Sequence, residues 1–307
     1  MVRRRLAATA ALLVLGAVGC GERSEPLGEL EQPYPVTVPG AGEQPVVIRE
    51  RPERIVALDA GAAELVIALG ARDRLVGVPA GIARGERPRQ APAAAAEVVS
   101  RAQQVRVSEI VRLEPDLIIA TPAVDILDVT AAQRESEAAL YVQPTSSVDD
   151  VVRATIELGF VVGEPVAARE LAAQIRGQVA QIEEQVASQP VVTTFVDTGF
   201  FIPIQGRSLG GDLVRRARGE SVAGESPGRE PFPLNRLRRL DPQVYIATSD
   251  SRVTLGTLRS DPRTAQLGAV RERRVVVVPS DLLSRAGPRV GRALELVAEA
   301  LHPDAVG

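Results

Sequence analysis

Hydrophobic positions along this chain fall in short runs whose spacing alternates between that of strands and that of helices. A β-branched apolar run at 53–59 precedes an apolar helical face at 61–71, and another apolar run follows at 74–79. Helix and strand patterns then continue in turn at 108–115, 116–121, 131–139 and 140–144. This alternation predicts parallel βαβ units, in which helices cover a central sheet.

The alternation stops over residues 148–189, where no strand pattern occurs. In the second half of this segment an apolar residue recurs every three or four positions, at Leu171, Ile175, Val179, Ile182 and Val186. Such spacing predicts one long helix with a single apolar stripe. Pro190 ends it, and a second alternating set of strands and helices follows.

One helix–strand unit occurs twice, as SEIVRLEPDLIIA at 108–120 and as NRLRRLDPQVYIA at 235–247. Two lobes of similar plan would each need one copy of such a unit. We therefore predict an α/β fold with two lobes, at 47–147 and 190–307, each built on a central parallel sheet. The long helix within 148–189 joins them.

The N-terminus has the features of an export signal. Three arginines at positions 3–5 precede an apolar run at 6–18 that is short for a membrane-spanning helix. Cys20 follows as in a lipobox, although Ala17 stands where leucine is more usual. We predict a signal peptide at 1–19, lipid attachment at Cys20 and a flexible tether over 20–46. The alternatives are a plain signal peptide or an N-terminal anchor with an incidental cysteine.

Composition narrows the range of functions. The net charge of −3 becomes −6 once the three signal arginines are removed, which argues against a nucleic-acid partner. All 36 basic residues are arginines, as coding bias in a GC-rich genome would produce.

The chain is poor in metal donors and in catalytic motifs. With one histidine and one cysteine it cannot form the imidazole- and thiolate-rich sites that hold bare metal ions. The histidine, His302, follows the last helical pattern, where we expect a surface residue rather than a ligand. No nucleophile elbow or phosphate-binding loop occurs. We expect no enzymatic activity, no metal site and no cofactor, with a metal present only inside a bound chelate.

Three segments carry a resemblance to a known family: RIVALDAGAAELVIALGARDRLVGV at 54–78, EIVRLEPDLIIA at 109–120, and LGAVRERRVVVVPSDLLSRAGPRVGRALELVAEALHP at 267–303. In this order and spacing they resemble substrate-binding proteins of cobalamin, ferric-siderophore and haem ABC importers. The resemblance implies a rigid long helix between the lobes, a ligand cleft between them, and a monomer.

Candidate ligand-binding residues lie in loops that follow predicted strands, where two-lobed α/β proteins bind. Asp59 and Asp197 each end the first strand of a lobe, so they could accept hydrogen bonds from a ligand or cap the following helix. Arg101, Arg252 and Arg285 could pair with carboxylate or phosphate, or could be ordinary surface arginines. The resemblance favours Arg285, which matches a position that the family uses.

Aromatic residues are scarce in the expected cleft, and Leu282 stands where some relatives have an aromatic residue. Phe200 and Phe201, after the first strand of the second lobe, either stack on a ligand or pack in a loop.

The resemblance also implies a docking glutamate on each lobe, seven residues before the proline of the repeated unit. Those positions hold Ser108 and Asn235, with Glu109 beside the first and Arg236 beside the second. Serine and asparagine are favoured helix N-caps, and we expect Ser108 and Asn235 to be caps. Ser108, Glu109 and Asn235 are the candidates for contact with a permease.

These observations predict a lipid-anchored, extracytoplasmic component of an ABC importer that captures a cobalamin-, siderophore- or haem-like ligand and delivers it to a membrane permease. The alternative is a surface lipoprotein that keeps this fold as a structural or sensory partner-binding module without transport.

Overall fold

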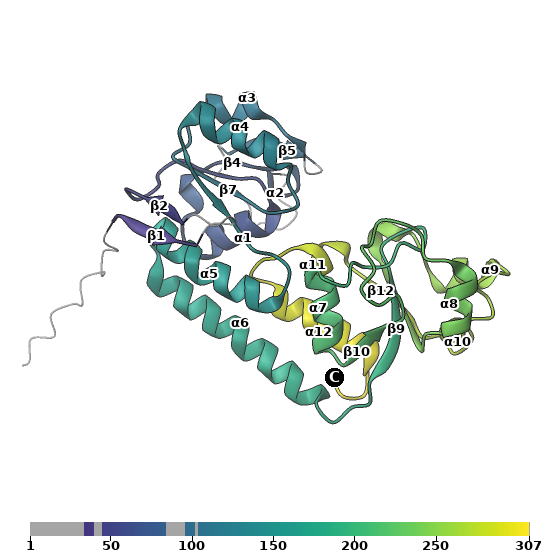
Figure 1. Cartoon of the computed structure of the whole chain (residues 1–307). Helices are drawn as coiled ribbons and strands as arrows, with labels where there is room; N and C mark the ends of the chain where they lie inside the picture. The colour runs from purple at the N-terminus through teal and green to yellow at the C-terminus, as the bar shows by residue number, and fades with distance from the viewer. Residues whose placement is uncertain (1–33, 40–44, 84–95, 102–103, 307) are drawn as a thin grey trace, which may run out of the picture. The chain divides into compact units, whose positions relative to one another are not determined.

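Two largely parallel sheets organise the chain, as the sequence predicted (Figure 1). The computed structural model describes residues 34–39, 45–83, 96–101 and 104–306, all within one unit at 32–307. The predicted signal peptide, Cys20 and much of the predicted tether lie outside the described residues. No helix among the described residues is both long and apolar enough to cross a bilayer.

The first sheet has the strand order β6-β5-β4-β3-β7-β8, and only its β5–β6 pair is antiparallel. We call this sheet and helices α1–α4 the N-lobe. Its strands are β3 (Ile55–Ala57), β4 (Leu75–Pro79), β5 (Glu97–Arg101), β6 (Gln104–Val105), β7 (Leu117–Ala120) and β8 (Ala139–Val142). Its helices are α1 (Ala60–Ala68), α2 (Ala80–Ala83), α3 (Val107–Arg112) and α4 (Ile126–Ser136), with a short 3-10 turn at Arg72–Arg74.

Alternate residues of the N-lobe strands enter two separate cores. Ile55 and Ala57 pack with Leu65 of α1 on one face of the sheet. Val56 packs with Ile110 of α3 on the other. Successive strand side chains point to opposite faces, so a sheet covered on both sides needs these continuous apolar runs.

The second sheet is parallel throughout, in the order β10-β9-β11-β12. We call this sheet and helices α7–α12 the C-lobe. Its strands are β9 (Val192–Asp197), β10 (Gly219–Ser221), β11 (Val244–Thr248) and β12 (Val275–Val278). Its helices are α7 (Leu209–Arg216), α8 (Leu234–Leu240), α9 (Leu255–Ser260), α10 (Gly268–Arg271), α11 (Ser280–Ser284) and α12 (Val290–Leu301), with a 3-10 turn at Ser249–Ser251.

Helix α5 (Val148–Val162) and the long helix α6 (Pro165–Val186) connect the lobes. Gly163 ends α5 in a left-handed conformation, and Pro165 starts α6, so the two helices reverse direction within a short turn. Ala168 at the start of α6 enters the N-lobe core, whereas Ile182 near its end enters the C-lobe core. The helix therefore packs against both lobes.

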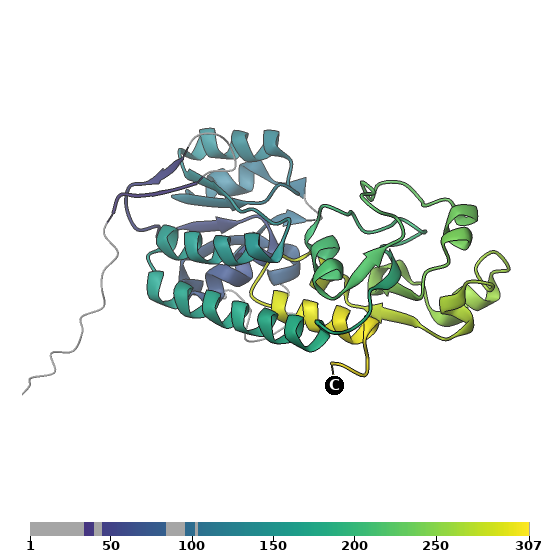
Figure 2. The same ribbon diagram turned by 60° about the horizontal axis from the view of Figure 1, so that its bottom comes forward.

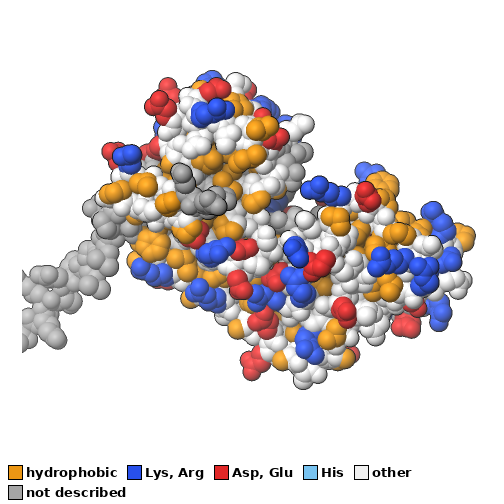
Figure 3. Space-filling model, in the orientation of Figure 1, with side chains coloured by type: hydrophobic (Ala, Val, Ile, Leu, Met, Phe, Trp, Pro, Cys, Tyr) orange, Lys and Arg blue, Asp and Glu red, His pale blue; other side chains and the backbone are white. Residues whose placement is uncertain are grey.

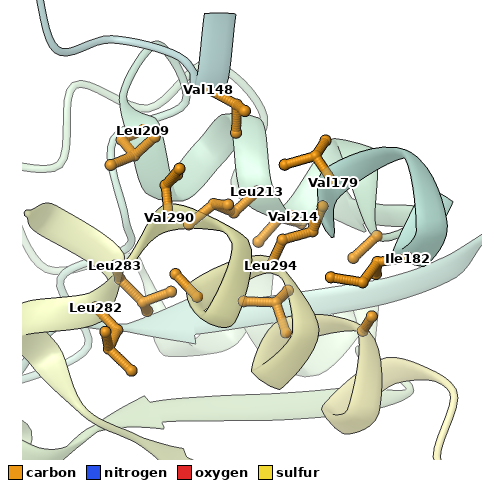
Figure 4. Close-up of a cluster of buried hydrophobic side chains, with 14 of the residues drawn as sticks. Val148, Val179, Ile182, Leu209, Leu213, Val214, Leu282, Leu283, Val290 and Leu294 are labelled. Atoms are coloured by element: carbon orange, nitrogen blue, oxygen red, sulfur yellow. The ribbon is translucent and has the colours of Figure 1, made fainter. Parts of the chain in front are cut away.

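Four of the five residues of the predicted stripe are buried on α6, and Leu171 is half-buried. In the C-lobe core, Val179 and Ile182 of α6 lie with Leu213 and Val214 of α7 and Leu294 of α12 (Figure 4). Helix α6 runs beside α12 in both ribbon views (Figure 2).

A short antiparallel pair differs from the prediction. Strand β1 (Val36–Val38) pairs with β2 (Val46–Ile48), although the sequence assigned 20–46 to a tether. Val36 and Val38 are buried with Ile48 against the N-lobe core. Three residues are too few to show a periodic pattern, so the sequence alone did not reveal the strand.

Candidate functional site

The carboxyl ends of the N-lobe strands meet the C-lobe. In this sheet β3, β7 and β8 are parallel neighbours, so the residues that follow them share one edge. Gln143, after β8, donates through Nε2 to the Ala286 carbonyl at 2.8 Å. A Cβ on Gly61 of α1 would lie 2.6 Å from that same oxygen, so only glycine fits there. Figure 3 shows the surface hollowed between the lobes.

A buried ion cluster links the lobes at this edge. The Glu64 side chain on α1 is 1% exposed and pairs with two arginines of the C-lobe. Its Oε1 lies 2.7 Å from Arg285 Nη1 and 3.0 Å from Arg289 Nη2. Asp281 accepts from Arg289 Nη2 at 3.0 Å. Burial is the largest single influence on the pKa of Arg289 and lowers it, but the hydrogen bonds and charges of Glu64 and Asp281 together raise that pKa above its ordinary value, so the guanidinium stays charged.

Arg285, a predicted ligand-binding residue, is therefore already paired across the lobes. Glu64, Arg289 and Gln143 were not among the residues predicted from the sequence. A single glutamate inside the apolar helix GAAELVIA was the available signal, because an acidic residue at a core position needs a partner.

Unpaired polar atoms gather at the same edge. Among the described residues, three buried side-chain atoms have no hydrogen-bond partner: Thr121 Oγ1, Gln143 Oε1 and Arg289 Nη1. Thr121 follows β7, Gln143 follows β8, and Arg289 pairs with Glu64. Buried polar atoms are rarely left unpaired in a closed core. Their concentration here makes this edge the candidate site.

The two predicted aspartates serve the fold in different ways. Asp59 is the N-cap of α1, where its side chain accepts a hydrogen bond from the Gly61 N–H at 2.8 Å. Capping is one of the two roles that the sequence left open for Asp59. Burial raises the pKa of Asp59 above its ordinary value, although the backbone hydrogen bonds from Gly61 and Ala62 and the charge of Arg285 lower it. Asp197 caps no helix: it is fully buried and accepts from the Gly199 N–H and the Tyr245 hydroxyl.

The remaining ligand candidates lie on loops and edges. Phe200 is 84% exposed and Phe201 half-buried, and both have positive φ angles. Phe201 packs on the core under α8 and α9, which is one of the two roles that the sequence left open for it. Arg252 is exposed and follows the 3-10 turn at Ser249–Ser251. A Cβ built on Gly199 would lie 3.7 Å from the Ser251 Cα, so this turn lies close to the loop after β9. Arg101 is exposed at the end of β5.

The exposed apolar side chains at the carboxyl end of strand β7 were also not predicted from the sequence. Ile126 and Leu127, which follow β7 at the start of α4, are 57% and 74% exposed. The loop after β9 exposes Phe200 on the other lobe. These exposed apolar side chains at the strand ends of both lobes are candidates for contact with a ligand.

The expected helix caps are wrong. Helix α3 begins at Val107 with Arg106 as its N-cap, and α8 begins at Leu234 with Pro233 as its N-cap. Neither cap makes a side-chain hydrogen bond, and Ser108 and Asn235 are exposed inside the first turn. Each helix starts earlier because the Arg106 and Pro233 carbonyls already accept helical hydrogen bonds. Glu109 is half-buried and pairs with Arg106 and Arg112.

The expectation that His302 lies on the surface is also wrong. It is 6% exposed, and its Nε2 lies 3.1 Å from the Ala217 carbonyl oxygen. No group of three metal-binding side chains forms within the described residues.

Comparisons with known proteins agree with this geometry. The family described as periplasmic binding protein matches residues 55–282. An uncharacterized ABC transporter substrate-binding lipoprotein of Bacillus subtilis is 23% identical, over 99% of this chain and 99% of its own. A cobalamin-binding protein of Halobacterium salinarum is 27% identical, over 88% of this chain and 74% of its own.

Solved structures share the fold. The periplasmic vitamin B12-binding protein of Vibrio cholerae has a TM-score of 0.69 at 24% identity, covering 81% of this chain and 96% of that one. A periplasmic haem-binding protein of Pseudomonas aeruginosa has a TM-score of 0.70 at 24% identity, covering 83% and 94%. At such identity the likeness shows the fold alone.

Proposed function

Since this chain belongs to the periplasmic binding protein family, we propose that it is the extracytoplasmic substrate-binding component of an ABC importer and that its ligand is a corrinoid of the cobalamin type. Members of this family are binding proteins rather than enzymes, in agreement with the sequence analysis. Relatives named for binding cobalamin or vitamin B12 support the choice of ligand.

The observation that carries the choice of a corrinoid over haem is the position of each side chain that could bind haem iron. Proteins hold haem iron through His, Tyr, Cys or Met. The single histidine is buried against Ala217. The single cysteine and the single methionine are residues 20 and 1, in the predicted anchor and signal.

The three tyrosines are engaged inside the lobes. Their hydroxyls donate to the Val161 carbonyl, to Glu157 and to Asp197, from Tyr34, Tyr141 and Tyr245 respectively. Burial raises the pKa of each hydroxyl, which opposes formation of a tyrosinate. A cobalamin carries its own groups on both axial positions of the metal, so it needs no such donor from the protein.

The exposed apolar side chains fit the same ligand. Ile126 and Leu127 on the N-lobe and Phe200 on the C-lobe offer apolar contacts to the faces and edges of a macrocycle. The unpaired Gln143 Oε1 and Arg289 Nη1 atoms are buried, so they would face a ligand only after the lobes separate at this edge.

Calorimetric titration of the purified protein against cyanocobalamin, haemin and ferrichrome tests this proposal. We expect cyanocobalamin to bind, and haemin to give no absorption spectrum typical of a protein-ligated iron. A haemin complex with such a spectrum, or heat from ferrichrome alone, would overturn the choice of ligand.

Substitution of the apolar side chains gives a second test. Leu127→Ala and Phe200→Ala should each weaken cyanocobalamin binding about tenfold or more, because burying such a side chain contributes about 1.5–3 kcal/mol. Val166→Ala is the matched control, since Val166 is 51% exposed on α6, away from the strand ends. Equal affinity in all three variants would place the ligand elsewhere.

We further propose that the mature chain is anchored by a lipid on Cys20. The sequence around Cys20 and the lipoprotein relative of Bacillus subtilis support this. The Cys20→Ala variant should move from the membrane fraction to the soluble fraction, and retention on the membrane would contradict lipid attachment.

A further inference from the structure

Positive charge is concentrated in one part of the C-lobe. Residues 234–274 contain nine arginines and four acidic residues, a net charge of +5, in a chain whose total is −3. The rest of the chain therefore carries −8. We call six exposed arginines of this segment the arginine cap: Arg236, Arg238 and Arg239 of α8, Arg259 of α9, Arg271 of α10, and Arg273 after it.

The arginine cap covers a single layer of helices. Leu237 of α8, Leu258 of α9 and Val270 of α10 are buried in one hydrophobic cluster with Phe195 and Tyr245 of the sheet. The three helices therefore cover the same sheet face, and their arginines lie on its outer surface. Figure 3 shows arginine side chains gathered over this end of the C-lobe.

Within the described chain, no arginine of the cap forms an ion pair with an acidic residue. Arg236 lies over the Phe232 ring, with its Cζ 5.2 Å from the centroid. Two nearby carboxylates are occupied: Asp261 pairs with Arg263, and Asp241 accepts from the Gly268 N–H.

The corresponding helix of the N-lobe is arranged differently. Arg112 of α3 pairs with Glu97 and with Glu109, and Arg106 pairs with Glu109. Its charges neutralise one another, although α3 and α8 come from the same repeated unit. The two lobes therefore present surfaces of different charge, and the unsatisfied one is cationic.

From this we propose that the arginine cap docks on an acidic surface of the importer's membrane permease. The proposal rests on the transport function above, which requires a permease partner. Guanidinium groups bind carboxylates in a two-pronged geometry and are therefore suited to acidic side chains. The proposed transport function supplies a permease as the partner, and the vesicle experiment below distinguishes a permease from an anionic bilayer.

The test uses the full-length protein, without ligand, and the permease–ATPase complex of the same importer in nanodiscs of neutral lipid. The variant R236Q/R238Q/R239Q should associate about tenfold or more slowly than the unchanged protein at low salt, with a weaker salt dependence, as loss of charge steering predicts. The control R49Q/R169Q/R176Q removes equal charge from exposed arginines elsewhere, including one that also lies over a phenylalanine ring. It should associate normally.

Each outcome decides the proposal. Equal association rates for both triple variants would overturn it. So would Arg-dependent binding to phosphatidylglycerol vesicles with unchanged permease association, which would assign the cap to lipid. Cyanocobalamin affinity should be unchanged in both variants. Because docking is measured without ligand, failure of cyanocobalamin to bind would count against the corrinoid proposal and not against the cap.

Discussion

Asp197 is a carboxylate without solvent contact that keeps two hydrogen-bond donors. The Tyr245 hydroxyl donates to it at 2.6 Å and the Gly199 N–H at 2.8 Å. Burial raises the pKa of Asp197, and the Tyr245 hydrogen bond opposes that rise. The tyrosine therefore compensates for the burial of the carboxyl group.

Tyr245→Phe should lower the free energy of unfolding by about 1–3 kcal/mol, because it leaves a buried acceptor without its donor. Urea denaturation measures this. Tyr141→Phe is the control, since the partner Glu157 has a side chain 12% exposed and can recover hydrogen bonds from water. A loss as large in the control as in the test variant would refute the argument.

His302 makes the stability depend on pH. Burial lowers its pKa more than the bond to Ala217 raises it. The unfolded chain then takes up a proton near the ordinary value of about 6.5 while the folded chain does not. The neutral imidazole therefore contributes stability that is present above that value and is lost as the pH falls toward the lower folded pKa.

The melting temperature should consequently fall between about pH 7.5 and about pH 5.5. In His302→Gln this part of the pH dependence should disappear. A melting curve with the same slope against pH in both proteins would rule out His302 as its cause.

At the scale of elements, the turn between α5 and α6 depends on a glycine. A Cβ on Gly159 would lie 2.1 Å from the Ala168 Cβ, so the two helices approach too closely for any other residue. Gly177, on the long helix α6, has nothing within 4 Å of its Cβ position. The two glycines thus differ in packing and not in backbone conformation.

Gly159→Ala should destabilise the protein by about 1–3 kcal/mol through overpacking. Gly177→Ala should stabilise it by about 0.5–1 kcal/mol, because alanine is the better helix former. Chemical denaturation should show that the free energy of unfolding falls in Gly159→Ala and rises in Gly177→Ala. A change of the same sign in both variants would contradict this difference in packing.

At the scale of the whole molecule, the Glu64 cluster connects residues 221 positions apart in the chain. Helix α6 joins the lobes on one side, and the ion cluster joins them at the strand ends. Movement of the lobes therefore requires either breaking this buried cluster or moving it as a unit.

Glu64→Gln should lower the stability by about 3–5 kcal/mol, since it removes the buried carboxylate that pairs with two half-buried arginines. Glu109→Gln is the matched control: Glu109 pairs with arginines at a surface position, where such pairs contribute about 0–1 kcal/mol. Urea denaturation compares them, and a small loss in Glu64→Gln would show that Asp281 alone neutralises the arginines.

The sequence by itself determined the alternation of strands and helices in each lobe, the long helix and the two-lobed plan, but not the short β1–β2 pair. These follow from spacing along the chain: β-branched runs form strands, and the stripe from Leu171 to Val186 forms one helix face. The family resemblance was sufficient to recognise a binding protein for the same reason, since it rests on segments whose order and spacing are visible in the sequence.

Only the tertiary structure decided how the candidate site is built. Arg285 pairs with Glu64 and Asp197 points inward to Tyr245, while Ser108 and Asn235 lie inside helices that start before them. Partners of buried charges come from segments far apart in the chain, and the first hydrogen bond of a helix depends on where the preceding chain is held. Local spacing carries information about neither, because both are set by packing between elements.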